Sequence, residues 1–358
     1  MSRALEIRNL EVRFGRPPRQ VAAVNDVSLQ LAAGQTLALI GESGSGKSVT
    51  LRAILRLHSP RSSTTRGSIR VGAHDVMTLS PRALADFRGA VAAMVFQEPL
   101  LALDPVYPVG QQIIETLVRH RTCSPAQARR RAVELLEQVH IPSPERRIHA
   151  YPHEMSGGMR QRAMIALALS CAPQLLLADE PTTALDATVQ IQILLLLREM
   201  QQALGLAIVF VTHDIGAAVE VADQIAVMYA GRIVEEGSAR AVLRNPRHPY
   251  TQALLASRAH GALNKGERLA AIPGSPPDLA RLPPGCAFAE RCTRAQARCL
   301  EETPRLDARD AGDAPATRDA PATRDAPATC DAQLAKDDRD THPVRCFFPL
   351  SAAAGDMN

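Results

Sequence analysis

Tryptophan is absent from this 358-residue sequence, and aromatic residues make up only 3% of it. Platforms that stack nucleic-acid bases need exposed aromatic rings, so we expect no nucleic-acid partner. Lysine is also scarce: it occurs only at 47, 265 and 336, and arginine carries nearly all the basic charge. The net charge of +4 is small and gives no reason to expect a polyanionic partner.

Long hydrophobic runs are missing as well. No apolar run approaches the roughly 18–20 residues that a membrane span requires. The longest candidate, LGLAIVFV at 204–211, has the length of a buried strand, and the N-terminal MSRALEIRNL has no hydrophobic signal core. We therefore expect a cytosolic chain, unless partner proteins hold it at a membrane.

Alternating apolar and polar residues mark the first forty positions as strands. Residues 5–14 and 24–31 have the two-residue period of a half-buried strand, and TLALIG at 36–41 is typical of a fully buried one. Further strands are predicted at 67–72, 91–96, 174–179, 207–212, 224–229 and 232–237, with helices between the later ones. This alternation predicts an α/β core built on a mainly parallel sheet.

Two stretches depart from this pattern. Residues 99–172 are helical in character, clearest at 109–120, 124–140 and 158–172, and we interpret them as a helical insertion into the core. After 258 proline and glycine accumulate, and the repeats DAPATR, DAPATR and DAPATC follow at 313–330. Polar, proline-interrupted repeats cannot bury a core and are predicted to be disordered. The sequence thus predicts a large domain over 1–258 and a small irregular one over 259–358.

A glycine-rich turn follows the strand at 36–41. GESGSGKS at 41–48 fits G-x-x-x-x-G-K-[ST] between a predicted strand and a predicted helix, the context of a phosphate-binding loop. The N–H groups of such a loop cradle phosphates, its lysine neutralises them, and the final hydroxyl binds Mg²⁺. The candidate nucleotide-binding residues are Gly41, Ser43, Gly44, Gly46, Lys47, Ser48 and Val49, with Ser48 also a Mg²⁺ ligand.

An apolar strand with an acidic end lies downstream. LLLADE at 175–180 ends in Asp179 and Glu180, which a parallel sheet would carry to its C-terminal edge. Asp179 would bind Mg²⁺ there, usually through a water, and Glu180 would polarise the water that attacks the γ-phosphate. The loop and the strand end together predict a P-loop nucleoside triphosphatase.

The segment YPHEMSGGMRQR at 151–162 indicates the family. Its SGG resembles the signature of ATP-binding cassette (ABC) proteins, and it stands before the acidic strand, where that family places it. Ser156, Gly157 and Gly158 would offer a hydroxyl and helix N-terminal N–H groups to a γ-phosphate. The usual glutamine at the fifth signature position is Met159 here, with Gln161 two positions on, which resembles the peptide-importer branch.

Further landmarks resemble the same family. The resemblance assigns Gln97 in VFQEP to the Q-loop, which senses Mg²⁺ and the attacking water and links to the membrane subunits. It places Asp186 in PTTALD at the dimer seam and His213 in VTHD against the γ-phosphate. Phe14 precedes Gly41 by 27 residues, where the family stacks an aromatic ring on adenine; a core phenylalanine on a strand is the alternative.

Seven cysteines occur, most of them near the C-terminus. RHPYTQALL at 247–255 and four cysteines resemble the tail of bacterial oligopeptide and dipeptide importer ATPases, which implies a 4Fe–4S cluster on Cys286, Cys292, Cys299 and Cys346. The gaps between the first three exceed those of most zinc sites, yet four thiolates suit zinc as well as iron–sulfur, and a metal-free tail is a third possibility. Cys330 lies in the repeat, and Cys123 and Cys171 are predicted to be buried.

The resemblance covers roughly residues 3–300 and 340–350 and implies an ATPase subunit of an ABC importer, with di- or oligopeptides as the expected cargo. The family sandwiches ATP between the phosphate loop of one protomer and the signature helix of the other. The expected partners are therefore a second ABC ATPase subunit, two transmembrane permease subunits and an extracytoplasmic substrate-binding protein, at the cytoplasmic face of the inner (plasma) membrane. The alternatives are importers of nickel, glutathione or opines, an exporter, and a soluble ABC ATPase.

Overall fold

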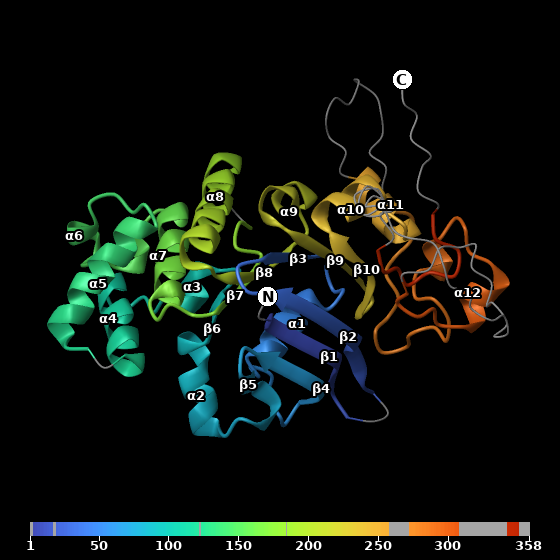
Figure 1. The fold of residues 1–358 in the computed structure, drawn as a ribbon, viewed down its shortest axis with the longest axis horizontal. Coiled ribbons are helices and arrows are strands. Elements are labelled where there is room, and N and C mark those ends of the chain that lie inside the picture. The colour runs from blue at the N-terminus through green and yellow to red at the C-terminus, as the bar shows by residue number, and fades with distance from the viewer. Residues whose placement is uncertain are drawn as a thin grey trace, which may run out of the picture. The chain divides into compact units, whose positions relative to one another are not determined.

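A parallel sheet forms the centre of the first part of the chain (Figure 1). Five of its strands lie in the order β9-β3-β8-β7-β6, and every neighbouring pair is parallel. Nearly all their side chains are buried, as in parallel sheets covered on both faces, which is why the sequence runs are continuously apolar. The predicted parallel core is confirmed. The strands are β3 (Thr36–Ile40), β6 (Ala92–Val95), β7 (Leu175–Asp179), β8 (Ala207–Thr212) and β9 (Gln224–Tyr229).

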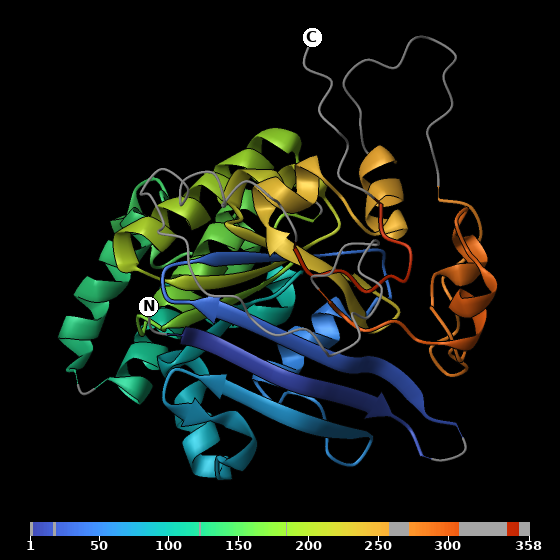
Figure 2. The same cartoon turned by 45° about the vertical axis from the view of Figure 1, so that its right-hand side comes forward.

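A second sheet is antiparallel, and its long strands β1 and β2 are seen along their length in Figure 2. Its order is β2-β1-β4-β5, with β1 spanning Arg3–Phe14, β2 Val21–Ala32, β4 Ser63–Val71 and β5 His74–Asp75. The predicted alternation holds in β1, where Leu5, Ile7, Leu10 and Val12 are at most 1% exposed. β4 starts at Ser63, four residues before its predicted beginning, because polar, exposed residues there conceal the strand period.

The helical block is an insertion between two neighbouring strands. β6 and β7 pair directly, although the helices from α3 to α7 separate them in sequence. Ser124 begins α5 with a capping box to Gln127 and a proline at the first helical position, which satisfies the free N–H groups of that end. The block contains α3 (Pro99–Ala102), α4 (Val109–His120), α5 (Pro125–Gln138), α6 (Pro144–Arg147), η2 (Pro152–Glu154) and α7 (Gly157–Leu169).

Other helices flank the strands. The sequence predicted α1 (Lys47–Ile54), α8 (Ala187–Leu204) and α9 (Ile215–Val221), but no element was predicted for η1 (Val76–Thr78) and α2 (Pro81–Ala90). The start of α2 does carry a signal, because Ser80 caps it and Pro81 occupies its first position. Among the helices that the structure describes, none is both long and apolar enough to cross a membrane.

The computed structural model describes residues 3–16, 19–121, 123–183, 185–257, 272–307 and 342–350. By its internal contacts the chain divides into two compact units, the second beginning at Ile233. That unit contains β10 (which starts at Arg232 and ends at Ser238), α10 (Ala239–Arg244), α11 (Pro249–Ala256), η3 (Ala289–Arg291) and α12 (Ala297–Glu301). The division falls before the compositional boundary at 258 because β10 pairs with Val344 near the C-terminus. The repeat at 313–330 and Cys330 lie outside the described residues.

Candidate functional site

The loop between β3 and α1 packs too closely for side chains at two of its glycines. Gly41 and Gly46 have φ angles of 153° and 104°. A Cβ atom at Gly41 would lie 2.2 Å from the carbonyl oxygen of Met228, and one at Gly46 would lie 2.3 Å from that of Ala23. Only glycine allows this backbone path, which turns the chain sharply into the N-terminus of α1. A curled backbone that opens a helix is suited to bind phosphate.

The Lys47 ammonium group lies inside this loop. Its Nζ donates hydrogen bonds of 2.8 Å to the carbonyl oxygens of Gly41 and Glu42. Burial lowers the pKa of Lys47, while the negative charges of Glu180 and Asp179 oppose that shift. Ser43 and Gly44 are exposed beside it, at the tip of the loop. The loop thus places a cation among backbone groups that can coordinate phosphate oxygens.

The acidic end of β7 meets the first turn of α1. Ser48 Oγ donates a 2.6 Å hydrogen bond to Asp179 Oδ1, although the two residues are far apart in sequence. Asp179 is 1% exposed, and burial raises its pKa in spite of that bond and of Arg52, whose guanidinium lies 3.8 Å from Oδ2. A hydroxyl and a carboxylate are the oxygen ligands that Mg²⁺ prefers. The donor set therefore fits the predicted cation.

Three side chains converge on one oxygen of Glu180. Its Oε2 lies 3.2 Å from Gln97 Nε2, 3.0 Å from Thr183 Oγ1 and 3.4 Å from His213 Nδ1. Glu180 has a φ angle of 46°, a left-handed conformation that is uncommon for a residue with a side chain and is concentrated at functional sites. Oε1 accepts no hydrogen bond from the described residues. The arrangement fixes the carboxylate and leaves one oxygen free to take a proton.

Thr183 is the member of this group that the sequence analysis missed. It lies within PTTALD, the segment in which the family resemblance assigns a role to Asp186 only. Its hydroxyl bond to Glu180 depends on the tight turn after β7, in which Thr183 N also donates to the Glu180 carbonyl oxygen. The only sequence signal was a hydroxyl residue three positions after a strand-end carboxylate.

The SGG segment and Asp186 begin two adjacent helices. Ser156 caps α7 by accepting a hydrogen bond from Met159 N, and Asp186 caps α8 by accepting one from Val189 N. Gly158 faces Val189, where a Cβ atom would approach to 2.7 Å. Ser156 is exposed, and none of the described contacts joins it to the phosphate loop. Within one chain, the signature is therefore separate from the groups around Lys47 and Glu180.

Phe14 is half-buried at the end of β1 and touches a histidine that the sequence analysis did not single out. Its ring meets that of His58 edge-to-face, with centroids 5.2 Å apart. His58 Nε2 lies 2.9 Å from the carbonyl oxygen of Val49 in α1, so this nitrogen carries the proton and donates. His58 thus links the Phe14 ring to the helix that follows the phosphate loop.

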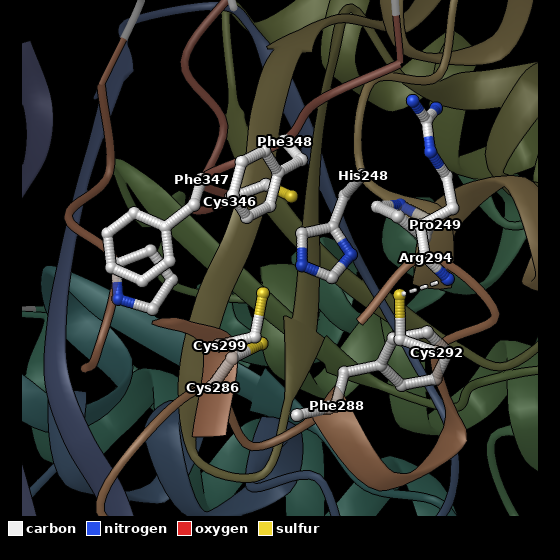
Figure 3. A pocket seen from close by; sticks show the side chains of 12 residues that line it. His248, Pro249, Cys286, Phe288, Cys292, Arg294, Cys299, Cys346, Phe347 and Phe348 are labelled. Atoms are coloured by element: carbon white, nitrogen blue, oxygen red, sulfur yellow. Dashed lines mark hydrogen bonds between the residues drawn. The ribbon is translucent and has the colours of Figure 1, made fainter. Parts of the chain in front are cut away.

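Four cysteines line one cavity in the second unit, as Figure 3 shows. They are the predicted set: Cys286, Cys292, Cys299 and Cys346. Cys286 N donates a 2.8 Å hydrogen bond to the carbonyl oxygen of Cys299, and Gly285 permits this approach because a Cβ atom there would lie 2.2 Å from the same oxygen. The cavity, of about 20 Å³, has room for a water-sized group.

Burial controls the chemistry of these thiols. It raises the pKa of Cys286 and Cys292, and it raises the pKa of Cys346 to about 12, with neighbouring thiols adding to the effect. These three thiols are therefore protonated unless a metal ion displaces the protons. Across the residues that the structure describes, no group of three or more His, Cys, Asp or Glu side chains forms a metal-ion site. The cysteines share a cavity, but they are not arranged around a single ion.

Sequence comparisons match both units to known families. The family model "ABC transporter" matches residues 24–183, and the model "Oligopeptide/dipeptide transporter, C-terminal region" matches residues 234–299. The oligopeptide transport ATP-binding protein OppD of Bacillus subtilis is 47% identical over 307 residues, which cover 86% of each chain. A putative peptide import ATP-binding protein of Brucella melitensis is 49% identical over 300 residues, 84% of this chain and 90% of that one.

Solved structures resemble about two thirds of the chain. A dimeric bacterial ABC transporter cassette, 28% identical, superposes with a TM-score of 0.59 and covers 66% of this chain and 99% of its own. The same values apply to a post-hydrolysis state of that dimeric cassette bound to ADP and Pi. A Clostridium perfringens protein described as part of an ABC transporter complex has a TM-score of 0.58 at 26% identity, covering 68% and 91% of the two chains.

Proposed function

Because this chain belongs to the ABC transporter family and to its peptide-import ATP-binding proteins, we propose that it hydrolyses ATP to power a membrane importer of di- or oligopeptides. The observation that carries this proposal is the cluster at the C-terminal edge of the parallel sheet, where Lys47, Ser48 and Asp179 adjoin Glu180. The names of the relatives favour peptides over nickel, glutathione or opines as the cargo.

The residues take complementary roles in this proposal. The backbone at 41–46 and Lys47 bind the β- and γ-phosphates, and the Phe14 ring stacks on adenine. Glu180 Oε1 accepts a proton from the water that attacks the γ-phosphorus, so that ADP and phosphate form. Gln97, Thr183 and His213 orient the carboxylate through Oε2. Ser48, Asp179 and Gln97 would hold Mg²⁺, which neutralises charge on the phosphates when bound.

A second ATPase subunit completes the site in this proposal. Ser156 is exposed and lies apart from the phosphate loop of its own chain, so its hydroxyl and the N-terminus of α7 are available to ATP held by a partner. The dimeric state of the similar cassette supports this arrangement. ATP binding would then close the dimer and exclude water, and hydrolysis would reopen it.

The membrane partners would dock on the helical block. Apolar side chains gather there beside Gln97, with Leu101 80% exposed and Val106 70% exposed. Exposed apolar residues near a catalytic loop are suited to a protein interface, and we assign this one to two transmembrane permease subunits. They would hold the chain at the cytoplasmic face of the membrane and receive cargo from an extracytoplasmic binding protein.

Replacing Glu180 by glutamine tests the proposed function. Glu180→Gln keeps the hydrogen-bonding shape but removes the base, so ATP turnover by the purified transporter should fall by ~10²–10⁴. Nucleotide affinity should persist because the phosphate loop is intact. Glu199→Gln, the same change at an exposed position of α8, serves as the control and should keep normal turnover. Undiminished ATP hydrolysis by Glu180→Gln would contradict the assignment.

For the second unit we propose a small cysteine-rich domain that holds a 4Fe–4S cluster. The support is that Cys286, Cys292, Cys299 and Cys346 all line one cavity. Four thiols are the ligand set of such a cluster, and among the described residues no three of them form a site for a single ion. The thiolates would ligate iron, and the neighbouring aromatic rings would keep water away.

Anaerobic purification tests the cluster directly. The full chain should carry about four iron and four sulfide equivalents, the composition of one such cluster, together with visible thiolate-to-iron absorbance. Cys299→Ser should remove both, whereas Cys123→Ser in the helical block should not. A colourless chain without iron would overturn this assignment and leave the ATPase assignment intact.

A further inference from the structure

A buried carboxylate joins three segments of the second unit. Glu235 lies on β10 and is fully buried. Its Oε1 accepts hydrogen bonds from Arg247 N at 2.7 Å and from His342 Nε2 at 2.5 Å, and its Oε2 accepts one from His248 N at 2.9 Å. One side chain thus connects β10, the start of α11 and the segment that begins at His342.

The surroundings keep this carboxylate charged. Burial alone raises the pKa of Glu235, but the hydrogen bond from His342 and the backbone N–H groups outweigh it, so the pKa lies below its ordinary value. A buried charge is tolerated only where donors satisfy it. Loss of any of these donors would leave a buried carboxylate oxygen short of a hydrogen bond and would destabilise the fold.

His342 depends on Glu235 for its orientation. Its side chain is buried, and its Nδ1 has no hydrogen-bond partner among the described residues. The ring also packs tightly against β10, since a Cβ atom at Gly237 would lie 2.9 Å from the Cβ of His342. Glu235 is thus the one polar anchor that the described residues provide for this ring.

The segment 342–345 leads directly to Cys346. It runs between β10 and Asp307, with isolated bridges from Val344 to both Glu235 and Asp307. Its hydrogen bonds include Arg247 Nη1 to His342 O at 2.7 Å, Glu236 N to Pro343 O at 3.1 Å, Asp307 N to Val344 O at 3.1 Å, Val344 N to Asp307 O at 2.8 Å, Arg345 N to Val234 O at 2.7 Å and Arg345 Nε to Ile233 O at 2.9 Å. The position of Cys346 therefore follows from the docking of this segment.

His248 couples the same carboxylate to the cysteine cavity. Its backbone N–H donates to Glu235, and its ring lines the cavity with the four cysteines (Figure 3). Burial lowers the pKa of His248 to about 4, so the ring is neutral, and it hydrogen-bonds the backbone of Arg345, next to Cys346. Glu235 thereby contacts both His248 in the wall of the cavity and the segment that supplies its fourth thiol.

Cys346 depends on distant contacts for its position more than the other three cysteines of the cavity do. Cys286, Cys292 and Cys299 lie within fourteen consecutive residues, and Cys286 and Cys299 share a backbone hydrogen bond. Cys346 follows Cys299 by 47 positions, and closing a loop of that length costs entropy that specific contacts must offset.

We propose that Glu235 and His342 form a lock that positions Cys346 in the cysteine cavity. Both are positioning residues, because they act on the thiol through the segment 342–345 and do not touch it. The lock matters for ligand binding only if the four-cysteine site of the proposed function exists. The placement of Cys346 is nevertheless a property of the metal-free chain and is tested there.

Alkylation of the reduced, metal-free, full-length chain measures this placement. Iodoacetamide labels each cysteine at a rate that mass spectrometry resolves peptide by peptide, and a docked Cys346 should react slowly. His342→Leu fills the space but cannot donate, so labelling of Cys346 should accelerate about tenfold, the effect of losing one hydrogen bond to a charged group. Labelling of Cys286 and Cys299 should stay within twofold of the wild type.

A matched pair of variants separates the lock from simple packing. His342→Gln retains an N–H donor and should keep Cys346 slow, whereas Glu235→Gln should expose Cys346 as His342→Leu does. Glu290→Gln makes the same change on an exposed residue of the same unit and should change nothing. The lock is refuted if Cys346 stays slow in both disruptive variants, if His342→Leu and His342→Gln behave alike, or if all four cysteines accelerate together.

A second measurement connects the lock to the proposed cluster. If the wild-type chain carries iron, His342→Leu should lower its iron content and His342→Gln should restore it. Equal iron content in these two variants would overturn the lock as a positioning device for the cluster site. A wild-type chain without iron would refute the cluster alone, because the alkylation rates still report on the lock.

Discussion

The two units of the chain hold their functional side chains by different means. In the first unit, the groups around Glu180 stand at the ends of regular parallel strands and in the turns that directly follow them. In the second unit, the cysteines lie in a region with only short helices and isolated bridges, and a buried polar network joins its distant segments. A sheet places residues by register alone, whereas an irregular region must place them by individual contacts.

This difference predicts what mutations will do in each unit. The first unit has a large apolar core, so removing one polar contact near Glu180 should alter catalysis more than stability. The second unit buries fewer apolar side chains, so removing one polar contact there should lower its stability. Three variants, in order of decreasing expected effect, test this difference between the units.

Glu235→Gln should produce the largest effect. A glutamine supplies one acceptor where the carboxylate satisfies three donors, so the free energy of unfolding of the second unit should fall by ~2–3 kcal/mol. Hydrogen exchange of the α11 amides, followed by mass spectrometry, measures this loss within that unit. Protection of β3 in the first unit should not change. An equal loss of protection in α11 and β3 would contradict the expectation that the destabilisation is confined to the second unit.

The same variant should change the pH dependence of stability. Because the folded pKa of Glu235 lies below its ordinary value of 4.5, the unfolded chain takes up the proton first. The stabilisation from Glu235 is therefore complete above pH 4.5 and is lost as the pH falls through the folded pKa. Acid titration of α11 protection should show this decrease in the wild type and a shallower one in Glu235→Gln.

Thr183→Val should have a smaller effect, and one confined to catalysis. The valine keeps the shape but removes the hydroxyl that donates to Glu180, so kcat should fall about tenfold while ATP affinity and stability stay the same. Thr183→Ser restores the hydroxyl and should recover most of the activity. Thr188→Val, at an exposed position of α8, is the control. A large loss of stability with unchanged kcat would show that Thr183 serves packing instead.

His58→Ala should have the smallest effect. Removing the ring that supports Phe14 should weaken ATP binding about threefold to fivefold, in line with the ~0.5–1.5 kcal/mol of an aromatic pair. Equilibrium binding of a fluorescent ATP analogue measures it. His74→Ala is a matched control, because His74 also meets a phenylalanine ring edge-to-face, that of Phe87, and should leave binding unchanged. Equal effects of the two variants would remove His58 from the nucleotide site.

Sequence patterns predicted the core strands and the order of the motifs, because both are local properties. A buried parallel strand has a continuous apolar sequence, and a phosphate loop requires glycines at fixed positions. Helix α2 and the start of β4 were missed because exposed polar residues there obscure the periodicity. Thr183 and His58 were missed because a hydroxyl or an imidazole has no distinctive pattern until folding brings it to Glu180 or Phe14.

By itself, the sequence determined that this chain carries a phosphate loop, an acidic strand end and a separate signature segment, and that four cysteines follow. Short-range geometry fixes the first three, so six to twelve consecutive residues suffice to specify each. The tertiary structure alone shows that Gln97, Thr183 and His213 share one oxygen of Glu180, and that Glu235 anchors the segment before Cys346. Contacts between residues as distant as 235 and 342 depend on chain closure and burial, which no local pattern encodes.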